Sequence, residues 1–77
     1  MAYESSKIEN VVKVIPLSQF TEIRVTQIGD EKVTHVDVRQ WFCTQKNPQM
    51  TPTQKGFRIG VDNVQELIDA IKQAAEL

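Results

Sequence analysis

The sequence predicts an α+β domain in which a curved four-stranded antiparallel sheet is followed by one C-terminal helix. Two observations support this prediction: β-rich runs alternate with Gly-, Pro- and Asp-containing breaks up to residue 61, and a helical pattern occupies the remainder. The 77 residues make one domain, close to the size at which a single hydrophobic core becomes marginal. We therefore expect a single domain over residues 11–77, a flexible leader over residues 1–10, and a homodimer that enlarges the core.

Four runs of the chain have the composition of β-strands. The first is V-V-K-V-I-P-L from Val11, which is rich in β-branched residues and ends at its proline. The second and third cover residues 22–28 and 32–42, with a Gly-Asp turn after the second. The third is long enough to require strong curvature or a bulge near its aromatic end. A polar loop over residues 44–53, interrupted by two prolines, precedes the fourth run over residues 55–61.

Side chains alternate across a sheet, so each face of the predicted sheet collects its own kind of residue. One face, here called the apolar face, collects Ile23, Val25, Val36, Val38, Phe57 and Ile59. The opposite face, here called the Trp41 face, collects Arg24, His35, Arg39, Trp41 and Arg58. A surface tryptophan beside arginines is typical of a binding site, because bases stack on aromatic rings and guanidinium planes. The alternative is that Trp41 only covers the end of the sheet, since solvent-facing strand positions are often charged without any ligand.

The C-terminal residues predict an amphipathic helix that begins near Asp62. The Asp62 carboxylate can cap its first turn, with Gln65 three residues on as a capping-box partner. The apolar positions, with Ala70 and Leu77 added, cover roughly half of the circumference, a wider arc than one sheet needs. We expect a two-fold interface with the same helix of a second copy. Its residues are Val64, Leu67, Ile68, Ile71, Ala74 and Ala75. The alternative is a terminal helix whose Ala70 and Leu77 touch water.

The net charge of -1 is divided unevenly along the chain. Residues 7–58 carry eight cations and five anions, or +3, and residues 59–77 carry one cation and four anions, or -3; Glu4 supplies the remaining -1. The predicted sheet is therefore basic and the predicted helix acidic. Such a division suits a protein that directs one face at phosphates. An acidic helix is also what a solvated helix face looks like, so charge alone does not decide the ligand.

The composition argues against several other classes of protein. No apolar run approaches the length of a bilayer span, and the polar N-terminus lacks the apolar core of a signal peptide, so we expect a cytoplasmic location, on the nucleoid in a bacterium. The single Cys43 cannot form an intramolecular disulfide, and with His35 it makes no zinc set. His35, Asp37 and Cys43 can be drawn as a catalytic group, but no second signal supports it. We expect no catalysis, no metal and no cofactor.

The stretch V-D-V-R-Q-W-F, the polar loop, P-T-Q-K-G-F-R-I and the closing helix resemble the single-stranded-DNA-binding domain of the transcriptional coactivator positive cofactor 4. The likeness is greatest with its short bacterial and phage-type relatives, and it runs from Glu22 to the C-terminus. The resemblance implies a homodimer whose curved sheets form a channel for unpaired DNA. The residues that it places in the channel are Arg39, Trp41, Phe42 and Lys55. The chain departs from the family where T-Q-I-G-D lacks an aromatic residue and where Gln54 replaces a second cation, so one stacking platform is missing and we expect a lower affinity.

The sequence thus predicts a DNA-binding homodimer that holds single strands with little sequence preference, in transcription regulation or in DNA replication or repair. The predicted nucleic-acid-binding residues are Arg24, Lys32, Arg39, Trp41, Phe42, Lys46, Lys55 and Arg58; the cations meet phosphates and the aromatic rings stack on bases. At Phe42 strict alternation and the resemblance disagree, because alternation turns this side chain to the apolar face. One alternative is a protein-interaction module that docks a transcription or replication partner through the Trp41 face. Single-stranded RNA is another possible ligand, since nothing in the sequence obviously reads a 2′-hydroxyl.

Overall fold

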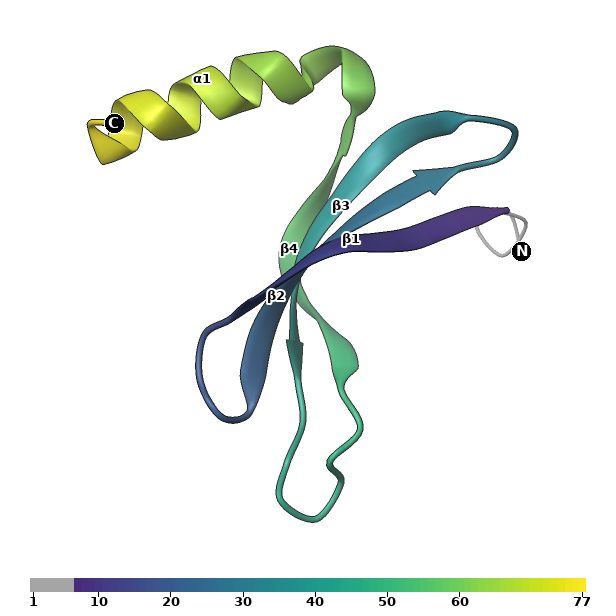
Figure 1. Ribbon diagram of the computed structural model, residues 1–77, viewed down its shortest axis with the longest axis vertical. Coiled ribbons are helices and arrows are strands. Elements are labelled where there is room, and N and C mark those ends of the chain that lie inside the picture. The colour runs from purple at the N-terminus through teal and green to yellow at the C-terminus, as the bar shows by residue number, and fades with distance from the viewer. Residues whose placement is uncertain (1–6) are drawn as a thin grey trace.

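The computed structural model describes residues 7–77, which form one open antiparallel sheet followed by two helical segments (Figure 1). The strands lie in the order β1-β2-β3-β4. Their bounds are β1 (Ile8–Pro16), β2 (Thr21–Gly29), β3 (Val33–Phe42) and β4 (Thr51–Gly60). A 3-10 helix, η2 (Val61–Asn63), leads into the α-helix α1 (Val64–Ala75). The predicted β-β-β-β-α fold is confirmed.

The two edge strands begin earlier than the sequence predicts. β1 begins at Ile8, so its pairing with β2 extends into the predicted leader, whose residues 1–6 lie outside the described part of the chain. β4 begins at Thr51 and includes Pro52, which we expected in the loop. One side of β4 has no neighbouring strand, and a proline at a sheet edge costs no ladder hydrogen bond on that open side. The edge position therefore explains why Pro52 is tolerated in β4.

The strand register separates the two faces of the sheet as the sequence predicts. On the apolar face Val25, Val38 and Phe57 form one row across β2, β3 and β4. On the Trp41 face Arg24 lies directly opposite Arg39. Because both rows come from continuous pairing of neighbouring strands, the alternation of side chains holds across the middle of the sheet.

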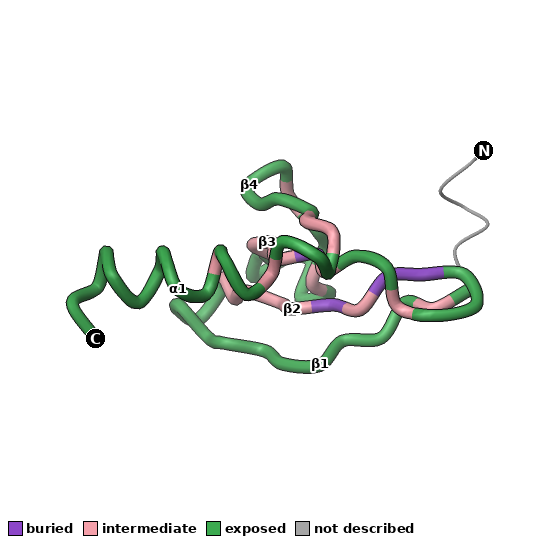
Figure 2. The backbone as a smooth tube through the Cα atoms, turned by 90° about the horizontal axis from the view of Figure 1, so that it is seen from above, coloured by how far each residue is buried: buried purple, intermediate pink, exposed green. Residues whose placement is uncertain are grey.

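Most of the apolar surface stays open within one copy of the chain. Among the described residues Ile28 is the only buried hydrophobic residue, and no side chain is fully buried. α1 extends away from the sheet and is connected to it through η2, which packs against β3 (Figure 1). In Figure 2 the buried positions lie on the middle strands, and β1 and α1 are exposed along most of their length. Within residues 7–77, Phe57 on the apolar face and Ile68 and Ile71 on α1 are exposed, and the other members of the apolar face are half-buried.

The start of α1 differs from the prediction. Asp62 lies within the 3-10 turn, and Asn63 occupies the N-cap of α1 without a side-chain hydrogen bond. The side-chain amide of Gln65 donates to Asp69 Oδ1 at 3.1 Å, one helical turn further on. The predicted capping box between Asp62 and Gln65 is therefore wrong, because the 3-10 turn shifts the first helical turn past Asp62.

No helix in residues 7–77 is long and apolar enough to cross a membrane.

Candidate nucleic-acid interface

Arg24 and Trp41 form a stacked pair on the Trp41 face. The guanidinium carbon of Arg24 lies 4.2 Å from the centroid of the indole ring, which is a cation–π contact. Glu22, which lies directly opposite Trp41 in the β2–β3 ladder, accepts a hydrogen bond from Arg24 Nε at 2.6 Å. Glu22 and Arg24 are two residues apart on β2, so both side chains point to the same face. The carboxylate and the indole ring together hold the guanidinium in place.

The indole of Trp41 is set with its N–H edge toward the protein. Trp41 Nε1 is buried and has no hydrogen-bond partner, the single such side-chain atom in the described part of the chain. Trp41 as a whole is half-buried, although the sequence predicts a residue that faces outward. Arg24 lies against one plane of the ring, a contact that depends on cross-strand register.

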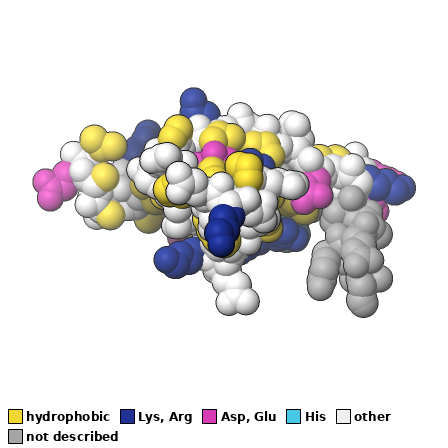
Figure 3. Space-filling view, turned by 90° about the horizontal axis from the view of Figure 1, so that it is seen from below, with side chains coloured by type: hydrophobic (Ala, Val, Ile, Leu, Met, Phe, Trp, Pro, Cys, Tyr) yellow, Lys and Arg dark blue, Asp and Glu magenta, His cyan; other side chains and the backbone are white. Residues whose placement is uncertain are grey.

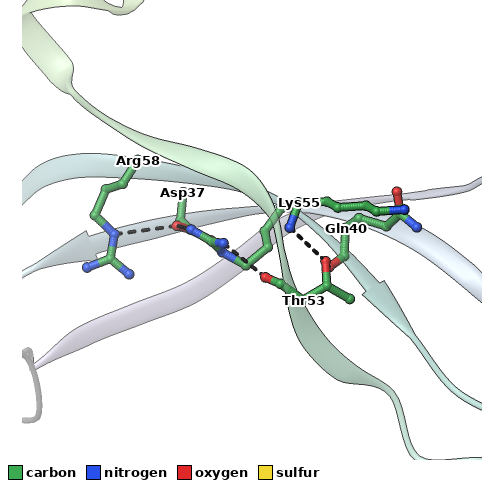
Figure 4. Close-up of polar contacts among 6 residues, drawn as sticks. Asp37, Gln40, Thr53, Lys55 and Arg58 are labelled. Atoms are coloured by element: carbon green, nitrogen blue, oxygen red, sulfur yellow. Dashed lines mark hydrogen bonds and ion pairs between the residues drawn. The ribbon is translucent and has the colours of Figure 1, made fainter.

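Asp37 pairs with two arginines of the same face. Its side chain is buried and accepts hydrogen bonds from Nε and Nη2 of Arg39 at 3.1 Å each, and from Nε of Arg58 at 3.4 Å (Figure 4). A carboxylate away from water needs such partners, since an unpaired buried charge costs on the order of several kcal/mol. The hydrogen bond with Asp37 raises the pKa of the Arg39 guanidinium. Arg39 therefore stays positively charged at every pH below the ordinary range of arginine.

The sequence predicts that Asp37 and the arginines share a side of the sheet, but it does not predict the ion pairs that the arginines form with Glu22 and Asp37. The signal lies in the repeated spacing E-I-R on β2 and D-V-R on β3, which places an acid and an arginine two residues apart on one strand. Residues with this spacing in a strand share a face, and their long side chains reach each other. Each acid–arginine pair thus belongs to the Trp41 face by the same alternation that placed its arginine there.

The end of the β3–β4 ladder next to Trp41 contains a bulge. Arg39 lies opposite Gly56, and Trp41 lies opposite Pro52, so residues 53–55 of β4 together face a single residue of β3. Arg39 Nη1 donates to the backbone carbonyl of Thr53 at 3.0 Å. The sequence predicts curvature or a bulge of the third strand near the aromatic pair; the irregularity lies at that point of the ladder, but its extra residues are on β4.

The hydroxyl of Thr53 holds the bulge to β3 from the other side. Its Oγ1 donates to the carbonyl of Gln40 at 2.8 Å and accepts a hydrogen bond from the backbone N–H of Lys55 at 3.0 Å (Figure 4). Backbone groups that a bulge leaves without a ladder partner need such replacements. The position of Lys55 in β4 is therefore set by contacts within the bulge.

Phe42 lies on the apolar face, away from Trp41. The β2–β3 ladder continues without a break through Trp41 to Phe42, which lies opposite Thr21. Neighbouring residues in an unbroken strand point to opposite faces. The Phe42 side chain is 42% exposed. Within one protomer the structure thus follows strict alternation at this position. The resemblance implies that the two aromatic rings line one channel, but the register places them on opposite faces.

The predicted lysines lie outside the row of arginines on the Trp41 face. Lys55 belongs to the β4 bulge, where alternation does not fix a face, and it is exposed at the sheet edge. Lys32 is in the turn between β2 and β3, and Lys46 is in the loop between β3 and β4, at the opposite end of β3; both are exposed. The structure therefore gathers the three predicted arginines and Trp41, and places the three predicted lysines at the periphery.

Hydrophobic and charged side chains both reach the surface of the described residues. In Figure 3 hydrophobic side chains reach the surface over the sheet and along α1, with lysine and arginine side chains between them. Within residues 7–77 no group of three His, Cys, Asp or Glu side chains is arranged to hold a metal ion.

No protein-family model matches the chain, and no curated protein and no solved structure matches it. Similarity to known structures thus does not bear on what the Trp41 face binds.

Proposed function

We propose that the protein is a homodimer that binds single-stranded DNA through the Trp41 face with little sequence preference, in transcription regulation or DNA replication or repair. The observation that carries the proposal is the stack of Arg24 on Trp41 beside two further arginines of the same face. Unpaired bases stack on indole and guanidinium planes, and arginine terminal nitrogens bind phosphates. The resemblance of V-D-V-R-Q-W-F and Q-K-G-F-R-I to positive cofactor 4 supports the same ligand.

The Trp41 face keeps a positive balance after its ion pairs are counted. Its arginines outnumber the carboxylates that pair with them, three against two: Arg24, Arg39 and Arg58 against Glu22 and Asp37. Lys46, in the loop between β3 and β4, and Lys55, at the β4 edge, make no ion pair among residues 7–77, and both are exposed at the periphery of the sheet. A surplus of cations on and around one face attracts a phosphate backbone and makes binding sensitive to salt.

The dimer is part of the same proposal, because one copy leaves its apolar surfaces open. Ile68 and Ile71 on α1 are 39% and 53% exposed, and Phe57 on the apolar face is 43% exposed. A second copy brings the same two surfaces, so a two-fold arrangement covers both at once. The predicted interface residues all lie on α1: Val64, Leu67, Ile68, Ile71, Ala74 and Ala75. Covering these surfaces leaves the Trp41 face outward for the ligand.

A protein-interaction module is the second candidate function. The observation that favours it is that all three arginines of the Trp41 face form ion pairs within the chain, which weakens their attraction to phosphates. A transcription or replication partner that docks on this face gains from the indole and the guanidinium planes without needing strong net charge. Single-stranded RNA is a variant of the first candidate, since it carries the same bases and phosphates.

The experiment that tests the proposal compares labelled oligo-dT with a duplex of equal length at two salt concentrations. We expect the single strand to bind more tightly, because stacking on the Trp41 face needs unpaired bases. Equal affinity for the duplex indicates a surface that binds phosphates alone. A folded protein that binds neither ligand at low salt contradicts the proposal and favours the docking module. Oligo-rU in a parallel titration shows whether the site distinguishes RNA from DNA.

A further inference from the structure

We propose that an unpaired base stacks on the guanidinium plane of Arg24, and that Trp41 serves as the support beneath this plane instead of the stacking surface. The inference rests on the proposed function and names the group that meets the base. It differs from the resemblance to positive cofactor 4, which assigns stacking to the aromatic pair of the third strand.

Arg24 covers one plane of the Trp41 ring. The guanidinium carbon lies 4.2 Å from the ring centroid, so one plane of the indole is already in contact with a flat group of this chain. Trp41 Nε1 is buried, so the N–H edge of the ring also points away from solvent. A base that approaches the pair from the side of Arg24 meets the guanidinium before it meets the indole.

Arg24 is held in one orientation and is still accessible to solvent. Glu22 accepts the Nε hydrogen bond at 2.6 Å, and a quarter of the Arg24 side chain is exposed. The two terminal nitrogens of Arg24 make no hydrogen bond among residues 7–77, and neither is among the buried atoms that lack a partner there. They therefore reach solvent. Because the side chain is already held in one orientation, a ligand that stacks on it loses little additional side-chain entropy.

Arg24 differs from the other arginines of the face in its contacts. Arg39 directs its donors at Asp37 and at the Thr53 carbonyl, so its plane is tied into the β3–β4 bulge. Arg58 pairs with Asp37 and forms no cation–π contact with any ring in the described residues. Among the three arginines of this face, Arg24 is the one that combines an aromatic support with terminal nitrogens that make no hydrogen bond within residues 7–77.

The neighbour of Arg24 on β1 also suits a base. Val14 lies directly opposite Arg24 in the β1–β2 ladder and is 39% exposed. It gives an apolar contact next to the guanidinium plane. Such a contact stabilises a base, which buries its apolar edge there, but does not stabilise a charged phosphate. Arg24 thus lies between an apolar neighbour and the basic row of the Trp41 face.

The experiment measures oligo-dT affinity for the wild type, Arg24→Ala and Arg24→Lys, with Arg58→Lys as the matched control on the same face. Lysine keeps the charge of arginine and loses its flat plane. We expect Arg24→Lys to lose nearly as much affinity as Arg24→Ala, about 5- to 150-fold, the range of one lost base stack. Arg58→Lys should lose less affinity than Arg24→Lys, because lysine keeps the charge that Arg58 offers to a phosphate. Lys72→Ala on α1, away from the Trp41 face, should bind as the wild type does. Circular dichroism of each variant shows that it is folded.

A second measurement needs no variant, because Trp41 is the single tryptophan of the chain. With Arg24 between base and indole, saturating oligo-dT should leave most of the Trp41 emission in place. Near-complete quenching means that the base stacks directly on the indole and overturns the inference, and so does wild-type affinity in Arg24→Lys when Arg24→Ala is weakened. These outcomes leave the proposed function intact. A folded wild type that does not bind oligo-dT overturns both.

Discussion

Gly56 lies so close to the backbone of Arg39 that a β-carbon at position 56 would stand 2.6 Å from the Arg39 Cα atom. The same β-carbon would stand 2.5 Å from the carbonyl oxygen of Val38. Real β-carbons do not approach backbone atoms this closely, so the glycine of the K-G pair allows β4 to lie close against β3 at the residue that begins the bulge.

We predict that Gly56→Ala destabilises the protein by about 1 to 3 kcal/mol, because the extra methyl group forces the two strands apart. Urea denaturation followed by circular dichroism measures the change. Gly60→Ala is the matched control on the same strand, since its β-carbon would meet nothing nearer than the Thr34 carbonyl oxygen at 3.9 Å. Equal stability of the two variants would contradict the close approach of β4 to β3.

Arg39→Lys should also lower stability, because lysine cannot bond Asp37 through two nitrogens and the Thr53 carbonyl through a third. We expect a loss of about 1 to 3 kcal/mol in the free energy of unfolding, the range for hydrogen bonds that involve charged groups. Arg58→Lys is the control, since Arg58 contributes one long hydrogen bond to Asp37 and is more exposed. An Arg58→Lys loss as large as that of Arg39→Lys would show that the bulge contacts of Arg39 carry no stability.

The effect of pH on the stability lost in Arg39→Lys follows from the pKa of Arg39. The pKa of Arg39 is raised in the folded state by its hydrogen bond with Asp37. A raised pKa means that the stabilisation is fully present below the unfolded-state value of arginine and is lost only as the pH rises through the higher folded-state value. The Arg39 charge therefore adds no pH dependence between about pH 6 and pH 9. Urea denaturation at both pH values checks this, and a wild-type advantage that disappears toward pH 9 would contradict it.

The faces of the sheet were predictable because side chains alternate with a period of two in any strand. Ile23 and Val25 share one face and Arg24 the other, whatever the exact strand ends. The contact between Arg24 and Trp41 was not predictable, because it needs the register of β2 against β3. Register depends on turn geometry, which residue types alone do not determine.

The residue pattern also did not determine the surface on which the helix packs or the place of Pro52 in a strand. The apolar arc of α1 was visible in the sequence, but an amphipathic pattern does not say which surface it packs on. In the protomer α1 is joined to the sheet through η2 and leaves Ile71 exposed. Pro52 was assigned to the loop because proline breaks ladders, and only the edge position of β4 makes it compatible with a strand.

Assembly is tested by a charge on the apolar side of α1. We predict that the wild type sediments as a dimer at micromolar concentration and that Ile71→Glu dissociates or unfolds it, because a carboxylate would be buried in the two-fold interface. Gln73→Glu adds the same charge to the same helix outside the predicted interface and should leave the dimer intact. A folded wild-type monomer in analytical ultracentrifugation would contradict the proposed dimer.

Phe42→Ala separates strict alternation from the resemblance to positive cofactor 4. The register places Phe42 on the apolar face, so we expect the variant to lose stability or dimer affinity and to bind oligo-dT normally once dimeric. The measurements are urea denaturation, sedimentation and oligo-dT titration of the same preparation. A stable dimer with clearly weakened oligo-dT binding would show that Phe42 reaches the ligand as the resemblance implies.

Charge and stacking leave different traces in the salt dependence of oligo-dT binding. Lys55→Ala should flatten the log-log slope by about 0.7, the value for one phosphate contact on a single strand. Trp41→Ala removes the support of Arg24 without removing a charge, so it should cost about 1 to 3 kcal/mol in binding and leave the slope nearly unchanged. Lys72→Ala, on the acidic α1, is the control that changes charge away from the Trp41 face. Titrations at several salt concentrations measure both quantities, and each variant must remain a folded dimer.

If binding survives Arg39→Ala, Trp41→Ala and Lys55→Ala combined in such a dimer, single strands bind elsewhere, and docking of a protein partner becomes the better account of the Trp41 face.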